Sequence, residues 1–374
     1  MMTSFTGTTE LVSLFLIVLL IYVVQCICWV TPRSIVFTLD LRGRGKRKLQ
    51  GYVWNAHDTA GVLANPFPPL TPLTAAQWPA FELTPDALQF SGKAGELVSI
   101  PWEKLEVIHS ESRLKCNGSV VFKGSEVQVL QYVALLGNLR SAARARRAEI
   151  IQDWLRRMMK IQAASRRILV FTGRSRWLRI LANLQFFFLF LLLPLGFYRF
   201  GTLIWWRALL ILVVLSLAIT LEFWTLHKML FPSATEQRFK TAAVTTLSPV
   251  AAIRACDVIA RDLLAGYHPL AVAGAILPAD DFRRFAGQQF RLCRFGDYLD
   301  QQYQGGLQKA MEQAIRKSKL NPQELLRPPE ADSGCVMYCP RCLAQYTKNR
   351  EECADCGYES LAPFGAAQHS RDAR

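Results

Sequence analysis

Four cysteines near the C-terminal end of the sequence have the type and spacing of metal ligands. In "YCPRCLAQYTKNREECADCGY", residues 338–358, two residues separate Cys339 from Cys342 and Cys353 from Cys356, with ten residues between the pairs. Paired C-x2-C spacings are typical of structural zinc sites, in which four thiolates surround the ion as a tetrahedron. The spacing therefore predicts a structural Zn²⁺ site in which these four cysteines are the ligands.

The chemistry of four thiolates also indicates a role and a compartment. Four protein ligands fill a tetrahedral ion and leave no position to activate a water, so the metal is predicted to be structural rather than catalytic. Thiolates persist in a reducing environment, which predicts a cytoplasmic C-terminal end. Disulfides within the pairs are the alternative. Cys335, four residues before the first pair, could replace a ligand or be free.

The remaining cysteines do not form a pattern typical of a disulfide framework. The sequence has ten cysteines, and those outside residues 335–356 lie in apolar or regularly patterned stretches. Free cysteine behaves as a small buried apolar residue in such settings. We expect that environment for Cys26, Cys28, Cys116, Cys256 and Cys293.

The cysteine-rich stretch resembles the zinc-ribbon family over residues 335–360. Pro340 lies within the first pair and Gly357 follows the second, but Leu343 occupies a position where such ribbons often carry Gly. The resemblance implies a structural metal and little about activity, because ribbons occur in proteins of unrelated function. A domain this small lacks a core of its own, so the ion would hold it in one shape for contact with a partner.

Three long apolar runs predict an integral membrane protein. The chain has 374 residues and is 51% hydrophobic, which is more than in most soluble proteins. A run without charges covers residues 11–30, and two further apolar runs cover residues 180–197 and 202–224, the last with Arg207 and Glu222 near its ends. Helices of about 20 apolar residues cross a bilayer. We therefore predict three transmembrane helices, an anchor within residues 1–30 and a helical hairpin within residues 180–226.

A secretory signal peptide is the alternative for the first run. The residues before it, "MMTSFTGTTE", contain no Lys or Arg, and no small-residue cleavage pattern follows it. Signal peptides usually have both features and a shorter apolar segment. These observations favour an uncleaved anchor.

Basic residues between the apolar runs predict the orientation. Residues 31–180 hold 23 Lys and Arg against 11 Asp and Glu, so 12 of the net charge of +15 lies there, densest in residues 42–48 and 166–179. Basic loops stay in the cytoplasm. The N-terminus and the hairpin tip are then outside, and the C-terminus is cytoplasmic. The same charges would suit anionic lipid headgroups and, less favoured here, nucleic acid.

The basic cytoplasmic segment is predicted to contain a small antiparallel β unit. A Pro-rich linker, residues 65–74, precedes short strand-like runs, and Asn117 and Gly118 suit a two-residue hairpin turn. Apolar residues at helical spacing from Ile150 to Met159 predict a closing helix. The stretch "IPWEKLEVI" and the element order resemble bacterial pleckstrin-homology-like domains over residues 80–160. The resemblance implies a binding or assembly module.

The predicted basic helix has two interpretations. Trp154, Leu155, Met158 and Met159 could lie against lipid with arginines at the rim, as in interfacial helices, or could pack on the sheet, as amphipathic helices usually do. Beyond the third apolar run, residues 233–330 have helical patterns and predict a cytoplasmic helical domain. Its helices are expected from Ser248 to Gly266, from about Asp280, and from Leu307 to Lys319.

No common catalytic motif is present. The sequence lacks a phosphate-binding loop, an H-E-x-x-H helix, a G-x-S-x-G elbow and a dinucleotide-binding glycine pattern. His57 and Asp58 are adjacent, but consecutive residues rarely orient one another for acid–base work. Glu222 and His227 lie near the inner end of the third run, where Glu222 could reach water or pair with Lys228.

These observations predict a non-enzymatic protein of a bacterial inner membrane. It would be a multi-pass scaffold, assembly factor or regulator that presents a zinc ribbon and a β-rich module to a cytoplasmic protein partner. Two alternatives remain open: a membrane-tethered nucleic-acid-binding regulator, and a membrane enzyme with an unrecognised active site.

Overall fold

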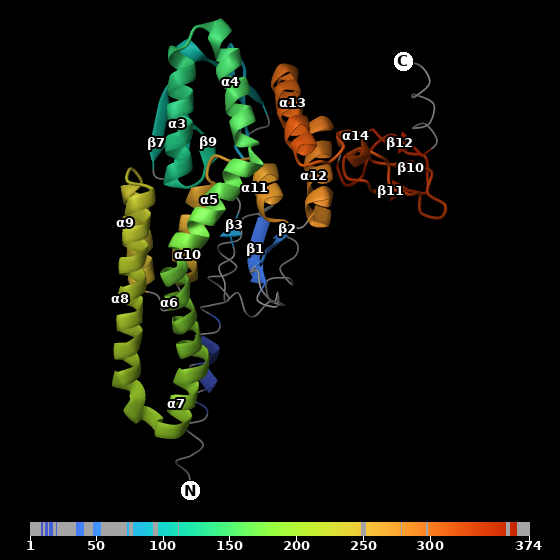
Figure 1. Ribbon diagram of the computed structural model, residues 1–374. Helices are drawn as coiled ribbons and strands as arrows, with labels where there is room; N and C mark the ends of the chain where they lie inside the picture. Colours follow the sequence, from blue (N-terminus) through green and yellow to red (C-terminus); the bar gives the residue numbers. More distant parts are fainter. Residues whose placement is uncertain are drawn as a thin grey trace.

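The computed structural model describes residues 78–364, apart from 93–95, 111, 248–251, 278, 297 and 357–359. Before residue 78 it also describes the strands at 35–40, 48–53 and 73–74 and scattered helical positions between residues 9 and 20. Figure 1 shows a mixed β and helical body, from which a long pair of helices extends on one side and a small cysteine-rich unit on another.

Six short strands form two antiparallel sheets of the body, in the orders β4-β5-β6 and β7-β8-β9. Trp102, in the short 3-10 turn between the sheets, is fully buried, and its indole N–H donates to the carbonyl oxygen of Thr84 at 3.0 Å. The strands are β4 Phe81–Leu83, β5 Ala87–Ser91, β6 Leu97–Pro101, β7 Val107–Ser110, β8 Arg113–Cys116 and β9 Ser119–Lys123.

The predicted hairpin turn at Asn117 and Gly118 is confirmed. Cys116 pairs with Ser119 across it, and φ is 47° at Asn117 and 81° at Gly118. A two-residue turn of this kind needs positive φ at both positions, which Asn and Gly tolerate. The Asn117 amide also donates to the carbonyl oxygen of Lys104 and accepts from the N–H of Glu106, so it holds the turn against the preceding loop.

The helix that follows the sheets begins earlier than we expected. Helix α3, Glu126–Ser141, follows β9 directly and contacts β7 and β8. Ser125 and Gln128 form a capping box that satisfies its first N–H groups. The predicted helix near residues 150–160 is the next one, α4, Arg144–Met158. The pattern predicted α4 correctly and missed α3, although the Ser-x-x-Gln cap is visible in the sequence.

The apolar face of α4 is covered by protein. Trp154 stacks on Trp78 at 5.2 Å between ring centroids, and Trp154, Leu155 and Met159 are all buried. The interpretation that laid these residues against lipid is wrong for the three of them. The packed alternative is right in that these residues are buried in protein, but the element that α4 mainly contacts is α13 (Gln301–Lys317) rather than a strand of the sheets.

Helices from the C-terminal part complete the body. The expected helices are present as α10, α12 and α13, but α13 begins earlier than predicted because Asp300 caps it. Ser248 and Pro249 lie outside the described residues. Glu82 of β4 accepts from the N–H groups of Leu299 and Asp300, both at 2.8 Å, and so joins the sheet to α13. The other helices are α5 Ile161–Arg174, α9 Thr235–Leu247, α10 Ala252–Leu264, α11 Pro269–Ile276, α12 Ala279–Arg294 and α14 Pro322–Leu325.

The strands before residue 78 were not predicted. β1 (Ile35–Asp40) pairs antiparallel with β2 (Lys48–Val53) and β3 (Leu73–Thr74), and this sheet contacts α10 and α11. The end of the expected Pro-rich linker is therefore paired in a sheet. Most of that linker and most of the basic cluster at 42–48 lie outside the described residues, as do most residues of the predicted first span.

The two later apolar runs form the pair of helices that extends from the body, here called the apolar hairpin (residues 176–230). One arm joins α6 (Arg176–Phe187), a π turn (Phe188–Leu192) and α7 (Leu193–Phe200), and the other is α8 (Trp205–Leu230). The π turn adjoins Pro194, which cannot donate a helical hydrogen bond. The arms contact each other, and Gln185 donates to Ser216 between them.

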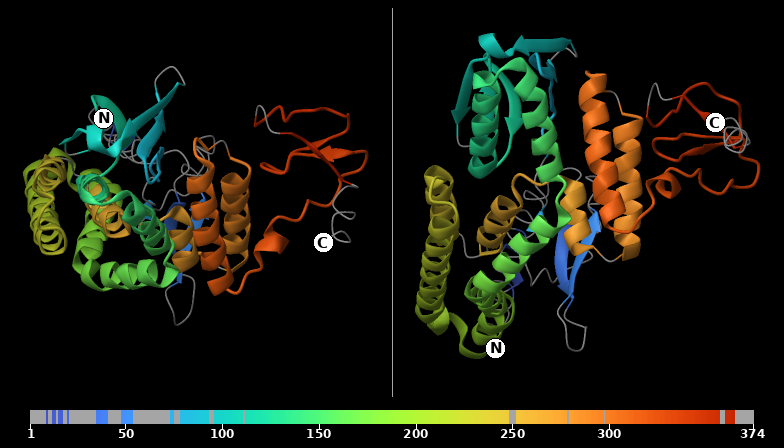
Figure 2. Two further views of the ribbon diagram at one scale, coloured as in Figure 1. Left: turned by 90° about the horizontal axis from the view of Figure 1, so that it is seen from above. Right: turned by 45° about the horizontal axis from the view of Figure 1, so that its top comes forward.

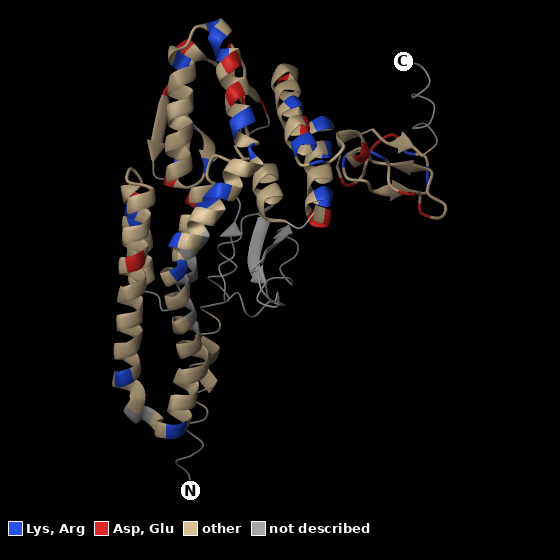
Figure 3. Ribbon diagram, in the orientation of Figure 1, with Lys and Arg blue, Asp and Glu red and all other residues tan. Residues whose placement is uncertain are grey.

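The outer surface of the apolar hairpin is uncovered and apolar. Trp206, Leu210 and Leu221 are 81%, 64% and 67% exposed, and Figure 3 shows charged residues on this hairpin only near its tip and toward the body. By length and composition, α8 is the one helix among the described residues that could cross a membrane, and Phe188–Phe200 is a shorter apolar segment. The number of spans stays a prediction.

At its base, the apolar hairpin enters the core of the body. Leu178, Ile219, Phe223 and Leu226 belong to the same buried cluster as Trp102 and the residues of α10–α13. The hairpin and the body therefore share one core, and the far part of the hairpin extends beyond it (Figure 2). There Phe190 meets Phe15 of the first apolar run, with 6.1 Å between the ring centroids.

A buried histidine should make the stability of the body depend on pH. The ring Nδ1 of His268 accepts from the N–H of Leu270 and caps α11, and burial lowers the pKa of this histidine to about 3. An unfolded chain binds a proton there near pH 6.5. The stabilisation is therefore complete above that pH and is lost as the pH falls through the window from 6.5 to 3.

We expect the wild-type protein to lose about 2 kcal/mol of stability at this site between pH 7.5 and pH 5. His268→Asn keeps a capping side chain without a titrating group, so its unfolding midpoint should fall less over that interval. Thermal unfolding of both proteins in non-ionic detergent at the two pH values measures the difference. Equal pH dependence in the two proteins would contradict the assignment.

Candidate metal centre and buried polar cluster

The four predicted ligands lie together in the small cysteine-rich unit. Their sulfur atoms are all within 4.8 Å of one another. Sγ of Cys339 lies 4.0 Å from Sγ of Cys356, and Sγ of Cys342 lies 3.6 Å from Sγ of Cys353. Zinc–sulfur bonds of about 2.3 Å in a tetrahedron place the sulfurs about 3.8 Å apart. The geometry is compatible with a zinc ribbon.

Three two-residue strands hold the two cysteine pairs. β10 (Met337–Tyr338) pairs with β11 (Gln345–Tyr346) and β12 (Ala362–Pro363). The β10–β11 hairpin carries the first pair at its turn, where the N–H of Cys339 donates to the carbonyl oxygen of Ala344. The second pair follows β11. The unit has little sheet and one described ring pair, Tyr338 with Phe364. Domains with so small a core usually need a structural ion or disulfides for stability.

The sequence departure at Leu343 has a structural counterpart. Leu343 has a φ of 66°, in the left-handed region where Gly is usually found. Its N–H donates to the carbonyl oxygen of Cys339, which closes the first cysteine turn. The ribbon therefore adopts the usual backbone at this position with a residue that is strained by it.

Tyr346 supports the second cysteine pair from outside. Its hydroxyl oxygen accepts from the N–H of Ala354 at 3.1 Å and lies 3.2 Å from Sγ of Cys353. Because the hydroxyl oxygen of Tyr346 accepts from the N–H of Ala354, its own hydrogen can be donated to the sulfur of Cys353. A second donor to Cys353, the N–H of Cys356, lies 3.3 Å away. Such outer contacts orient the ligands of a metal and tune their basicity.

The four thiols differ in acidity. Burial acts to raise the pKa of Cys353, but hydrogen bonds from Tyr346 and from two backbone N–H groups outweigh it and lower the pKa to about 7. Burial raises the pKa of Cys339, Cys342 and Cys356 to about 11. Cys353 is therefore the most acidic of the four thiols, and binding of an ion would displace protons from the cluster.

The described cysteines outside the four-sulfur group are free thiols in different environments. Cys335 is half-buried and is not part of the four-sulfur group. Cys116 and Cys293 are buried free thiols, as predicted, and burial raises the pKa of both. The side chains of Cys26, Cys28 and Cys256 lie outside the described residues.

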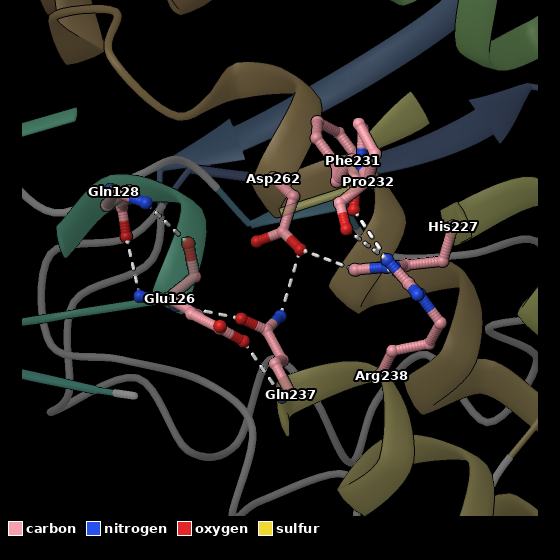
Figure 4. Close-up of polar contacts among 9 residues, drawn as sticks. Glu126, Gln128, His227, Phe231, Pro232, Gln237, Arg238 and Asp262 are labelled. Atoms are coloured by element: carbon pink, nitrogen blue, oxygen red, sulfur yellow. Dashed lines mark hydrogen bonds and ion pairs between the residues drawn. The ribbon is translucent and has the colours of Figure 1, made fainter. Parts of the chain in front are cut away.

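A second polar cluster is buried where the apolar hairpin meets the body (Figure 4). His227, in the last turns of α8, and Asp262 of α10 are fully buried, with Nε2 3.0 Å from Oδ2. The same carboxylate oxygen accepts from the Gln237 amide at 2.9 Å. Gln237 and Glu126 exchange two further hydrogen bonds between side chain and backbone. The cluster therefore joins α8, α9, α10 and α3.

Arg238 fixes the tautomer of His227. Its Nε lies 3.4 Å from Nδ1 of His227, and its Nη2 donates to the carbonyl oxygens of Phe231 and Pro232. Arginine has no acceptor, so Nδ1 of His227 accepts and its Nε2–H donates to Asp262. The ring of His227 therefore lies between a buried cation and a buried carboxylate.

No family model, curated protein or solved structure matches this chain. The ribbon assignment therefore rests on the spacing and clustering of its cysteines. The resemblance of residues 80–160 to pleckstrin-homology-like domains stays a prediction about a unit whose two sheets and helix are now described.

Of the other polar candidates from the sequence, only Glu222 is among the described residues. His57 and Asp58 lie outside the described residues. Glu222 is half-buried on α8, and no described ion pair joins it to Lys228. The partners of His227, Asp262 and Arg238, were missed because they are 35 and 11 residues away in sequence. In the sequence, the one sign of this cluster was the carboxylate of Asp262 among the apolar residues of α10.

The metal centre predicts zinc content directly. The full chain, purified in non-ionic detergent under reducing conditions, should contain one zinc ion per chain by elemental analysis. Cys339→Ser/Cys342→Ser removes two ligands and should lose the ion, whereas Cys335→Ser should retain it. Zinc-free wild-type protein, or equal loss in the Cys335→Ser control, would refute the four-ligand assignment.

The buried cluster predicts a large effect of a small substitution. Asp262→Ala leaves the Nε2–H of His227 and the amide of Gln237 without an acceptor, which should cost about 3 kcal/mol or more of stability. Asp262→Asn keeps one acceptor oxygen and should cost less than half as much. Thermal unfolding in detergent, followed by circular dichroism, compares the two. Equal losses would show that the acceptor contributes little.

Proposed function

We propose that this protein is a non-enzymatic membrane adaptor that displays a zinc ribbon to a cytoplasmic protein partner. The carrying observation is the uncovered apolar surface of the hairpin beside a polar body. Leu184, Phe187, Leu191 and Leu195 on one arm are more than half exposed, as are Trp206, Leu210 and Leu221 on the other. Exposed apolar patches of this extent mark membrane or partner contacts.

The dimensions of the hairpin favour a membrane. α8 has 26 residues, about 39 Å of helix at 1.5 Å per residue, against about 30 Å for the hydrocarbon core. The part of α8 that exceeds the thickness of the hydrocarbon core corresponds to its inner end, which is buried in the body. With the anchor predicted at residues 11–30, the proposed topology has three spans in a bacterial inner membrane, with the N-terminus outside and the C-terminus in the cytoplasm.

The ribbon is placed for contact with a partner. It lies beside α12–α14, away from the apolar hairpin (Figure 1), and α14 is followed by an exposed Pro-containing link, residues 327–334. Between Cys339 and Cys356 there are three basic residues and three acidic ones. Balanced charge suits a protein surface better than a phosphate backbone, which is bound mainly through Lys and Arg. A protein partner is therefore favoured over nucleic acid.

Two experiments test the proposal together. Reporter fusions at the C-terminus should be active only as cytoplasmic reporters. Affinity purification from cross-linked membranes should recover a cytoplasmic protein with the wild type and with Cys335→Ser but not with Cys339→Ser/Cys342→Ser, and the purified partner should bind the zinc-loaded protein directly. An externally located C-terminus, or recovery that is indifferent to the ribbon cysteines, would overturn the proposal.

A further inference from the structure

A large groove lies on the body, away from both the ribbon and the apolar hairpin. It has a volume of about 1750 Å³ and is bounded by α4, the start of α5, the α11–α12 junction and the C-terminal half of α13. Pockets for small molecules usually occupy about 300–1,000 Å³. None of the residues that line the groove belongs to the cysteine unit or to residues 176–230. A groove of this size suits a macromolecular segment.

The rim of the groove is strongly basic. Six cationic side chains line it against one carboxylate, that of Asp153, and Figure 3 shows this charge along α4 and α5. Arg156 pairs with Asp153. Within the part of the chain that the structure describes, none of the other five has an acidic partner. The six cations, all exposed, are Arg146, Arg156, Arg157, Lys160, Arg166 and Lys317.

The floor of the groove is apolar. Ile150 of α4, Ile161 of α5 and Leu277 are half-buried there, beside Met159 and several alanines. An occupant must therefore bring apolar side chains for the floor and negative charge for the rim. This combination is found in amphipathic acidic protein segments, which bind in grooves through one apolar face.

Nucleic acid and the membrane surface fit the groove less well. Single strands bind on exposed aromatic rings, and the one aromatic residue in the lining, Phe282, is buried. The groove also stands back from the second apolar run: along α5 and α6, Arg166 precedes Ile180, the first residue of that run, by 14 residues, or about 21 Å of helical rise. Lipid headgroups beside the apolar hairpin would not reach it.

We propose that the groove binds an acidic amphipathic helical segment of a protein partner. A helix of 15 residues is about 22 Å long and about 10 Å across, and its volume is comparable to that of the groove. The length also matches α4, which has 15 residues. This inference goes beyond the proposed function, because it assigns a second docking surface and the charge of what occupies it.

The test uses the full chain in non-ionic detergent and a fluorescent 15-residue helical peptide with Leu at alternating spacings of three and four and Glu elsewhere. A matched peptide with Lys in place of Glu controls for binding to detergent. Fluorescence anisotropy should show saturable binding of the Glu peptide only, weakened by added salt. A wild-type protein that does not prefer the Glu peptide would overturn the proposal.

Charge-reversal variants locate the binding. Arg157→Glu/Lys160→Glu should weaken affinity for the Glu peptide at least tenfold, and Lys309→Glu/Arg316→Glu, which reverses two exposed cations outside the groove, should change it less than twofold. Cys339→Ser/Cys342→Ser should bind as the wild type does, so failure here is separable from failure of the ribbon proposal. Circular dichroism checks that each variant folds.

Two outcomes would refute the assignment of the groove. Equal weakening by both charge-reversal variants would indicate a diffuse charge effect rather than a site. A 15-nucleotide oligothymidylate that binds more tightly than the Glu peptide, and loses affinity with Arg157→Glu/Lys160→Glu, would assign the groove to nucleic acid instead.

Discussion

The hydrogen bond between His227 and Asp262 joins the apolar hairpin to the body, and the positions of the other surfaces depend on it. Both side chains are fully buried, so neither can exchange its partner for water. Arg238 and Gln237 extend the arrangement, and Gln237 links it to Glu126 at the start of α3. Among the described residues, only Oδ1 of Asp262 within this cluster is buried without a hydrogen-bond partner. Polar groups buried in this way favour one packing over others that would leave them unpaired. The hairpin is thereby held in one orientation to the sheets and helices.

This constraint has consequences for the two proposed docking surfaces. α5 contacts α10 and α11, its first turn lines the basic groove, and its last turn leads into α6. α13, which lines the opposite wall of the groove, is fastened to β4 through Glu82. The groove is thus built from elements that are fixed to the hairpin, whereas the ribbon is attached through a Pro-containing link. A partner bound in the groove would therefore be held at a defined distance from the membrane. A partner bound to the ribbon would have more freedom of position.

The sequence predicted well those features that depend on neighbouring residues. The cysteine spacing gave the ligand cluster, Asn117 and Gly118 gave the turn, and Leu343 marked the strained position of the ribbon. It predicted poorly those features that depend on contacts between distant segments. The strand at residues 73–74 is set by pairing with β1, and the partners of His227 come from α9 and α10. α3 is a different case, because its Ser125–Gln128 cap was visible but its apolar residues lack a clear helical stripe.

The distribution of charge connects these features. Positive charge that the sequence alone assigned to orientation in the membrane has two locations in the structure. Arg174, Arg176 and Arg179 lie where the hairpin leaves the body, which is where residues that set topology are expected. Arg146, Arg157 and Lys160 lie at the groove, about 21 Å or more further along the helices by their rise, beyond the Debye length of about 8 Å. Charges folded at that distance are screened from the membrane surface, and the proposed acidic partner would give this basic surface a role beyond topology.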